Sequence, residues 1–168
     1  AQMDPKLGQN AVNLARILAL FREATGEGAR LVVFPECAVS GYGFATLEAG
    51  YAAAETIPGP AADALAAACR GTGAYAVVGL LERDGSENLY NSAVLVGPEG
   101  VVGVYRKAHL PLLGVDRFTT PGDSGFRVWD TAIGRVGIAI CYDLRFPEAA
   151  RVLALAGASG PALARQDP

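Results

Sequence analysis

The chain has 168 residues, of which 51% are hydrophobic, and its formal net charge is −3 at pH 7. This length suits one domain with a sizeable core. Lysine and arginine are scattered, and no apolar run approaches the length of a membrane span, which argues against nucleic-acid binding and against a transmembrane protein.

The cysteines and the single histidine indicate the cellular compartment and whether a structural metal site is expected. Cys37, Cys69 and Cys141 make an odd number with no paired spacing, so we expect three reduced thiols and no disulfide. No signal-peptide pattern opens the sequence, and we therefore expect a cytoplasmic protein. With one histidine and no Cys-x-x-Cys pair, a structural zinc site is not expected, and neither is a cofactor.

Helical and strand patterns alternate in the first part of the chain. Apolar residues at a 3.6-residue period predict a helix over residues 10–26. The apolar run at 31–34 predicts a short buried strand, which Pro35 ends. The Ala-rich stretch at 60–70 predicts a second helix.

The rest of the chain is dominated by strand patterns. Predicted strands lie at residues 75–81, 93–96, 101–105, 126–129 and 136–140. The last of these is short, apolar and partly β-branched, which is typical of a strand buried on both faces. Pro147 then opens a third helix and Gly157 ends it. Together the six strands and three helices predict an α/β fold.

Three residues with useful chemistry share one placement. Glu36, Lys107 and Cys141 each lie within two residues of the carboxyl end of a predicted strand. If the strands share a sheet or two packed sheets, these ends can converge in one crevice. A thiol needs a base to become a thiolate, and a cationic amine beside a carboxylate can stabilise an oxyanion.

Each residue also has a purely structural interpretation. Cys141 would fill a small space in the core. Glu36 would cap a helix or lie on the surface, and Lys107 would pack only its stem. We interpret Cys37 as a packed side chain, and His109 as a hydrogen-bonded structural residue rather than a base.

Three motifs, in the right order, resemble the nitrilase superfamily of carbon–nitrogen hydrolases. They are Phe34-Pro35-Glu36, Tyr105-Arg106-Lys107-Ala108-His109-Leu110-Pro111 and Cys141-Tyr142-Asp143-Leu144-Arg145-Phe146-Pro147-Glu148. The resemblance implies a four-layer αββα sandwich. It also implies a hydrolase that cleaves a small amide to acid and ammonia through a cysteine thioester.

The family's Glu-Lys-Cys triad falls on Glu36, Lys107 and Cys141. By this resemblance Glu36 is the base, Cys141 is the nucleophile, and Lys107 and the backbone N–H of Tyr142 hold the oxyanion. A further family carboxylate is matched by Asp116, which is one methylene shorter than the usual Glu and could equally be a loop aspartate.

Two alternatives to amide hydrolysis stay open. The same triad could hydrolyse a nitrile, or the chain could be an inactive copy of this fold that acts by association. Members of the family assemble through contacts that extend a sheet, so we expect the full-length protein to be a homo-oligomer.

Both ends depart from the family pattern. The resemblance predicts a partial domain over residues 1–157 and a non-matching tail over 158–168. The family's first strand would precede Ala1, and family members continue well beyond the last residue. Because the tail shows no strand pattern, we expect the strand before Cys141 to lack its next neighbour. The fold would then be incomplete at its C-terminal end, and the isolated chain aggregation-prone with little amidase activity.

Overall fold

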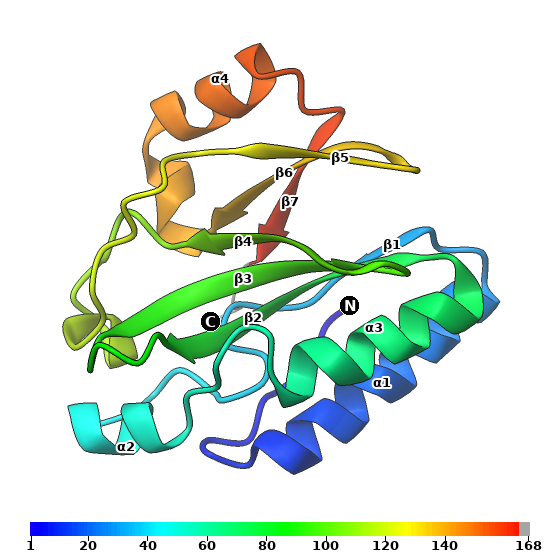
Figure 1. The fold of residues 1–168 in the computed structure, drawn as a ribbon. Helices are drawn as coiled ribbons and strands as arrows, with labels where there is room; N and C mark the ends of the chain where they lie inside the picture. The colour runs from blue at the N-terminus through cyan, green and yellow to red at the C-terminus, as the bar shows by residue number, and fades with distance from the viewer. Residues whose placement is uncertain (165–168) are drawn as a thin grey trace.

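Two β-sheets pack face to face, and helices cover the outer face of each sheet, in the computed structural model of the chain (Figure 1). The structure describes residues 1–164. The expected four-layer αββα sandwich is therefore confirmed.

The first sheet has the strand order β1-β2-β3-β4. Its strands are β1 (Leu31–Val33), β2 (Tyr75–Arg83), β3 (Leu89–Gly97) and β4 (Gly100–Arg106). β1 runs parallel to β2, while β2–β3 and β3–β4 are antiparallel, so β1, β2 and β4 all point the same way. Successive side chains of a strand face opposite sides, and Val78 accordingly lies in the core under the helices while Val77 lies between the sheets.

Helices α1 (Asn10–Gly26) and α3 (Pro60–Thr72) cover the outer face of this sheet (Figure 1). Both were predicted from the sequence. Ile17 and Phe21 of α1 are completely buried in the core that the two helices share with the sheet. The short helix α2 (Leu47–Ala52) was not predicted, because six residues are too few for a helical period to stand out.

The second sheet has the order β5-β6-β7. Its strands are β5 (Val128–Thr131), β6 (Gly134–Ile140) and β7 (Gly160–Ala164), and α4 (Pro147–Leu155) covers its outer face (Figure 1). Trp129 of β5 lies flat against Gly103 of β4, where any Cβ would collide with the indole ring. This close approach brings the two sheets together at that point.

Strand β7 corrects the prediction for the tail. The sequence offered no strand pattern after residue 157, yet Gly160–Ala164 pairs in parallel with Val136–Ile140 of β6. The β6 edge that we expected to be open is covered, and Ala162 and Ala164 are buried in the core between the sheets. A run with glycine, proline and small alanines has low strand propensity, so here tertiary pairing outweighs local preference. Residues 165–168 of the predicted tail lie outside the described residues.

We predict that a charge placed on β7 will unfold this edge. Ala162→Asp would put a carboxylate opposite Ile138 in an apolar core and should lower the free energy of unfolding by about 2–4 kcal/mol. Ala150→Asp, on the exposed side of the first turns of α4, is the matched control and should change it little. Urea denaturation compares the two, and equal midpoints would show that β7 contributes nothing to stability.

Candidate active site

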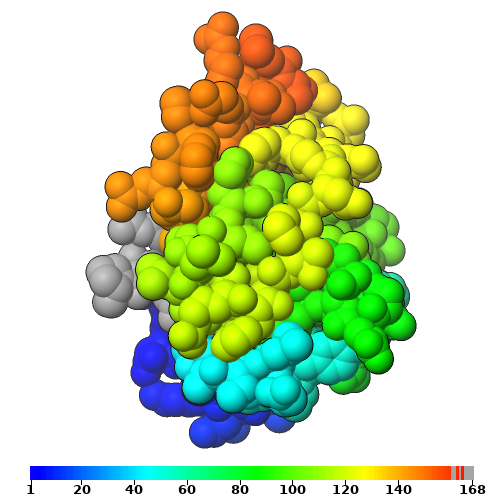
Figure 2. Space-filling model, turned by 90° about the vertical axis from the view of Figure 1, so that its left-hand side faces the viewer, coloured from blue at the N-terminus to red at the C-terminus, as the bar shows by residue number. Residues whose placement is uncertain are grey.

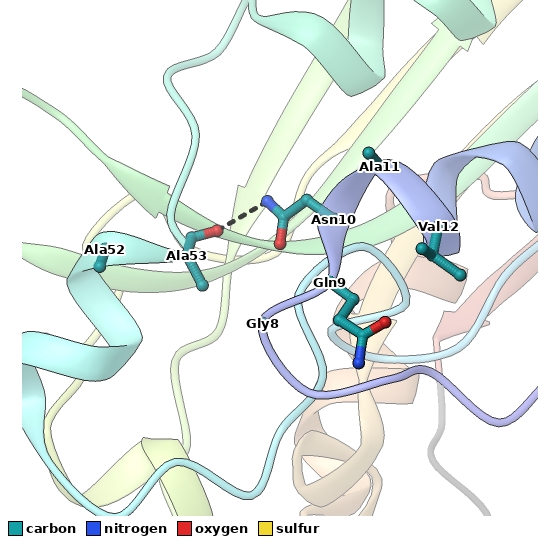
Figure 3. Close-up of a pocket in the computed structure, with 7 residues that line it drawn as sticks. All are labelled: Gly8, Gln9, Asn10, Ala11, Val12, Ala52 and Ala53. Carbon is teal, nitrogen blue, oxygen red and sulfur yellow. Dashed lines mark hydrogen bonds between the residues drawn. The ribbon is translucent and has the colours of Figure 1, made fainter.

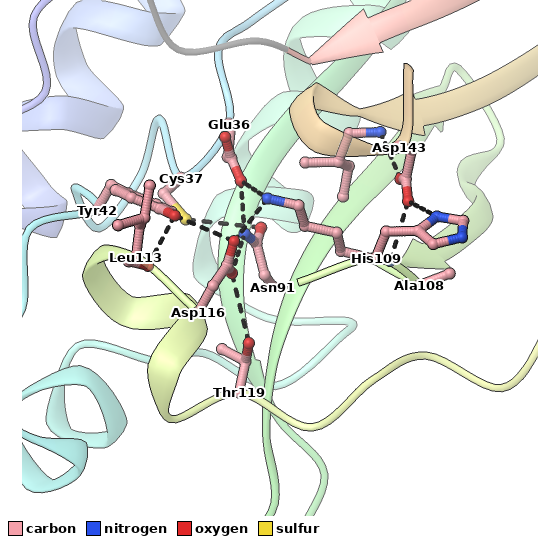
Figure 4. A network of polar contacts seen from close by, with 12 residues as sticks. Glu36, Cys37, Tyr42, Asn91, Ala108, His109, Leu113, Asp116, Thr119 and Asp143 are labelled. Carbon is pink, nitrogen blue, oxygen red and sulfur yellow. Dashed lines mark hydrogen bonds and ion pairs between the residues drawn. The ribbon is translucent and has the colours of Figure 1, made fainter. Parts of the chain in front are cut away.

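A buried lysine joins two carboxylates at one end of the first sheet. Lys107 directly follows β4, and its Nζ donates to Glu36 Oε1 at 2.5 Å and to Asp116 Oδ2 at 2.6 Å. Glu36 is 2% exposed, and Lys107 and Asp116 are each 1% exposed. Figure 4 shows the polar network that surrounds them. The structure therefore brings together three of the four predicted site side chains.

Glu36 reaches this point because the chain crosses β2 at a glycine. β1 ends at Val33, and the following turn lies directly over Gly79. A Cβ at Gly79 would lie only 2.6 Å from the backbone nitrogen of Cys37 and 2.8 Å from the Cα of Glu36. Only glycine allows this approach, so Gly79 sets the position of the Glu36 turn.

Asn91 is a site residue that the sequence analysis missed. Its Nδ2 donates to Glu36 Oε1 at 2.7 Å and to Asp116 Oδ1 at 2.8 Å, and its Oδ1 accepts from the Cys37 thiol at 3.6 Å (Figure 4). The side chains predicted for the triad follow the carboxyl ends of strands, whereas β3 runs antiparallel and contributes Asn91 from near its beginning. An amide inside an apolar strand was the available signal, because a buried amide needs partners.

The sequence allows Asp116 to be either a site residue or an ordinary loop aspartate. The structure places it inside the polar network around Lys107. It belongs to the 3₁₀ turn η1 (Gly114–Arg117), and both of its carboxylate oxygens have partners. Besides Lys107 and Asn91, the Tyr42 hydroxyl donates to Oδ2 at 3.1 Å and the Thr119 hydroxyl to Oδ1 at 3.4 Å (Figure 4). Its side chain thus gives the Lys107 ammonium a second carboxylate partner besides Glu36.

Burial and the charges of the two carboxylates set the protonation of the neighbouring donors. Burial opposes the charge on Lys107, but Glu36 and Asp116 outweigh it, so the pKa of Lys107 lies above its ordinary value and the ammonium persists at neutral pH. Burial, followed by the charges of Glu36 and Asp116, raises the pKa of the Cys37 thiol well above its usual range. Burial and the same two charges raise the pKa of the Tyr42 phenol. Cys37 is therefore packed, as predicted, and also donates into the network.

Cys141 begins the 3₁₀ turn η2 (Cys141–Arg145) directly after β6. Its φ is +41°, in the left-handed region that residues other than glycine rarely adopt. The side chain is partly buried against the core between the sheets. Backbone strain of this kind clusters at functional sites, and it persists only where the surroundings enforce it. Tyr142, whose backbone N–H was the predicted oxyanion donor, is the next residue of the same turn.

Asp143 connects the Cys141 turn to the segment that carries Lys107. Its carboxylate accepts hydrogen bonds from the Tyr105 hydroxyl at 2.8 Å and from the backbone N–H of His109 at 3.1 Å. The His109 ring lies with its Nδ1 2.8 Å from Asp143 Oδ1 (Figure 4), so the prediction of a hydrogen-bonded histidine is confirmed.

A separate surface pocket lies where the start of α1 meets the end of α2 (Figure 3). Its lining residues are Gly8, Gln9, Asn10, Ala11, Val12, Ala52 and Ala53. Asn10 Nδ2 donates to the carbonyl oxygen of Ala53 across it. The lining contains no ionisable or nucleophilic side chain, so this pocket is not a candidate for the reaction centre.

Within residues 1–164 no three His, Cys, Asp or Glu side chains are arranged to hold a metal ion. Across that same part of the chain, every helix is too short or too polar to span a bilayer.

Sequence comparisons connect the chain to enzymes of known name. The carbon-nitrogen hydrolase family model matches residues 1–159. A nitrilase of Pyrococcus abyssi is 46% identical over 158 residues, covering 94% of this chain and 60% of the relative. The omega-amidase NIT2-A of Xenopus laevis is 39% identical over 154 residues, covering 86% of this chain and 54% of the relative.

Structural comparisons give the same fold. A carbon-nitrogen hydrolase from Helicobacter pylori matches with a TM-score of 0.84 and 25% identity, over 98% of this chain and 57% of that one. An amidase from Nesterenkonia sp. AN1 matches with a TM-score of 0.79 and 24% identity, over 98% of this chain and 64% of that one. The chain spans 54–60% of the length of the two relatives named above.

Proposed function

The chain belongs to the carbon-nitrogen hydrolase family, and from that premise we propose that it hydrolyses a small amide to an acid and ammonia through a thioester on Cys141. Relatives named omega-amidase support the amide as substrate. In this proposal Glu36 is the base, and Lys107 and the backbone N–H of Tyr142 stabilise the oxyanion.

The observation that carries the proposal is the buried group of Glu36, Lys107 and Asp116. Removing three charged groups from water is costly, and a buried ion pair adds little net stability. A fold that served only for association would gain more from apolar side chains there. Buried ionisable groups gathered at a strand-end edge, with a shifted pKa at Lys107, are characteristic of catalytic sites.

The first half of the reaction forms the thioester. Glu36 takes the proton from the Cys141 thiol, and the thiolate attacks the carbonyl carbon of the amide. Negative charge develops on the carbonyl oxygen, and Lys107 Nζ and the Tyr142 N–H stabilise it. Glu36 then returns the proton to the amide nitrogen, the C–N bond breaks, and ammonia leaves.

The second half regenerates the enzyme. Glu36 takes a proton from a water molecule, and the resulting hydroxide attacks the thioester carbonyl with the same groups holding the oxyanion. The C–S bond breaks, the acid leaves and the thiol recovers its proton. Asp116 does not touch the reacting atoms in this scheme; it holds the Lys107 ammonium in place through the 2.6 Å contact.

A nitrile is the second candidate substrate, because the relative with 46% identity is named nitrilase. A thiolate can attack a nitrile carbon as well as a carbonyl carbon, and with one proton this gives a thioimidate. The thioimidate takes up one water molecule and releases ammonia to leave the same thioester. The two substrates therefore differ in the steps that lead to the thioester, and they share its hydrolysis.

Hydroxylamine trapping tests the function. We expect the protein to release ammonia from small primary amides and, with hydroxylamine present, to form the hydroxamate of the acyl group, since hydroxylamine attacks a thioester in place of water. Turnover of nitriles in preference to amides would favour the second substrate. Absence of both products with either class, from a folded protein, would contradict the proposal.

A further inference from the structure

We propose that Asp143 is a positioning residue that fixes the Cys141 turn against the strand end carrying Lys107. This inference rests on the proposed function, in which Cys141 is the nucleophile. Asp143 itself contacts none of the reacting atoms in that scheme.

The buried carboxylate of Asp143 accepts the hydrogen bonds that join the two segments. Asp143 is completely buried. Its Oδ2 accepts from the Tyr105 hydroxyl at 2.8 Å and from the backbone N–H of Ile140 at 3.0 Å. Its Oδ1 accepts from the backbone N–H of His109 at 3.1 Å and lies 2.8 Å from that residue's Nδ1 (Figure 4).

The hydrogen-bond partners of Asp143 lie close in sequence to Lys107 and Cys141, the two residues that act on the same substrate in the proposed reaction. Tyr105 lies two residues before Lys107, and His109 lies two residues after it. On the other side, Ile140 immediately precedes Cys141. The carboxylate is therefore bonded to residues on both sides of Lys107 and to the residue just before Cys141, two positions after which Asp143 itself lies. In Figure 2 the orange atoms around residues 141–150 lie against the yellow-green atoms around residues 105–120.

The backbone conformation of Cys141 explains why the turn needs this restraint. Its left-handed φ of +41° is unfavourable for a side chain with a Cβ, so the turn would relax without restraint. The bond from Ile140 to Asp143 restrains the residue just before the cysteine. At the far end of the turn, the rings of His109 and Phe146 stack with centroids 3.9 Å apart.

A carboxylate, rather than an apolar side chain, joins the two segments. This indicates that Asp143 orients them and does not only fill space between them. Among the ion pairs of residues 1–164, none joins Asp143 to a lysine or arginine, so hydrogen bonds satisfy the carboxylate. A buried charge is tolerated only when such bonds are made, and each one fixes a direction that an apolar contact would leave free.

The test compares two tyrosines of the same core. Tyr105→Phe removes the hydrogen bond to Asp143 and the one that the Tyr105 hydroxyl accepts from the backbone N–H of Ala108 at 3.2 Å, and it leaves the ring. Tyr75→Phe is the matched control: Tyr75 lies in the same core between the sheets, and its hydroxyl accepts from the backbone N–H of Ala132 at 3.2 Å, in the β5–β6 hairpin. Asp143→Asn is the stronger variant.

We expect Tyr105→Phe to lower kcat on a small amide by about tenfold with KM unchanged, and to slow alkylation of Cys141 by iodoacetamide by a similar factor. Asp143→Asn should lower both further, by about 100-fold, as a displaced nucleophile does. Tyr75→Phe should match the wild type. Thermal melts show whether the two tyrosine variants are equally folded. If Asp143→Asn does not fold, Tyr105→Phe alone tests the positioning role of Asp143.

The inference and the proposed function can fail separately. If the wild type hydrolyses amides and Tyr105→Phe equals Tyr75→Phe in kcat and alkylation rate, the positioning role is wrong and the function stands. If the wild type releases no ammonia while Cys141 alkylation still falls in Tyr105→Phe but not in Tyr75→Phe, the function is wrong and the positioning role stands.

Discussion

Replacing Cys141 by alanine should abolish ammonia release, with a loss in kcat on the order of 10⁶-fold, the size found when the nucleophile of a catalytic triad is removed. Alanine removes the only atom that can form the thioester in the proposed scheme, and it removes little buried surface because the thiol is only partly buried. Ammonia release from the amide measures the loss, and hydroxamate formation should disappear with it.

Two other cysteines of the chain provide controls for this experiment. Cys69 lies on the buried face of α3, and its thiol donates to the carbonyl oxygen of Val96 at 3.7 Å, in the core between helix and sheet. Cys69→Ala should therefore keep normal turnover. Cys37→Ala removes the thiol donor of Asn91 and should lower turnover modestly through that contact. Undiminished ammonia release by Cys141→Ala, measured beside an unchanged Cys69→Ala, would end the assignment of the nucleophile.

Ligand sites of α/β sheets form at the carboxyl ends of strands, and this tendency explains how much of the site the sequence could predict. Glu36, Lys107 and Cys141 follow β1, β4 and β6, and short apolar runs marked those three strands clearly. The structure brings Glu36 and Lys107 into direct contact, and Asp143 connects the Cys141 turn to the same segment. Local patterns were sufficient here because each residue lies next to its own strand in the sequence.

The residues that sequence reading missed depend on contacts between distant segments. Asn91 enters the site because β3 runs against its neighbours, and strand direction is a property of the whole sheet. Gly79 matters only because the turn at Glu36 crosses it, 43 positions earlier in the sequence. Asp143 was noticed as part of a motif, but its partners at Tyr105 and His109 are 38 and 34 residues away.

The same reasoning explains the error at β7. Gly160–Ala164 has no β-branched residue, so no local pattern identifies it as a strand. It becomes a strand because β6 offers an unpaired row of backbone groups beside it, and five residue pairs form between the two strands. The prediction of low amidase activity for the isolated chain stays a prediction, but an open β6 edge is no longer its reason.

Replacing Lys107 by methionine should be the most destabilising single change at the site. Methionine keeps most of the volume of the side chain but removes the positive charge from between Glu36 and Asp116, which are almost fully buried. Breaking a buried ion pair in this way costs about 3–5 kcal/mol, which is a large share of the stability of about 5–15 kcal/mol that is usual for a domain. Lys6→Met is the matched control, because Lys6 pairs with Asp4 on the surface and an exposed pair contributes about 0–1 kcal/mol.

The pH dependence of this loss identifies its cause. Without Lys107, two buried carboxylates repel each other, so the pKa of at least one of them must rise in the folded variant. A carboxyl group with a raised pKa destabilises the fold above that pKa, and the penalty disappears as the pH falls and the group takes up a proton. We therefore expect the urea midpoints of Lys107→Met and the wild type to differ most near neutral pH and to converge as the pH falls toward about 4, the ordinary pKa of a carboxyl group in the unfolded chain. Adding Glu36→Gln and Asp116→Asn to Lys107→Met should restore much of the stability at neutral pH, since it removes both stranded charges, while ammonia release stays lost. A loss that is independent of pH and is not relieved by the two amide substitutions would show that Lys107 stabilises the fold by packing alone.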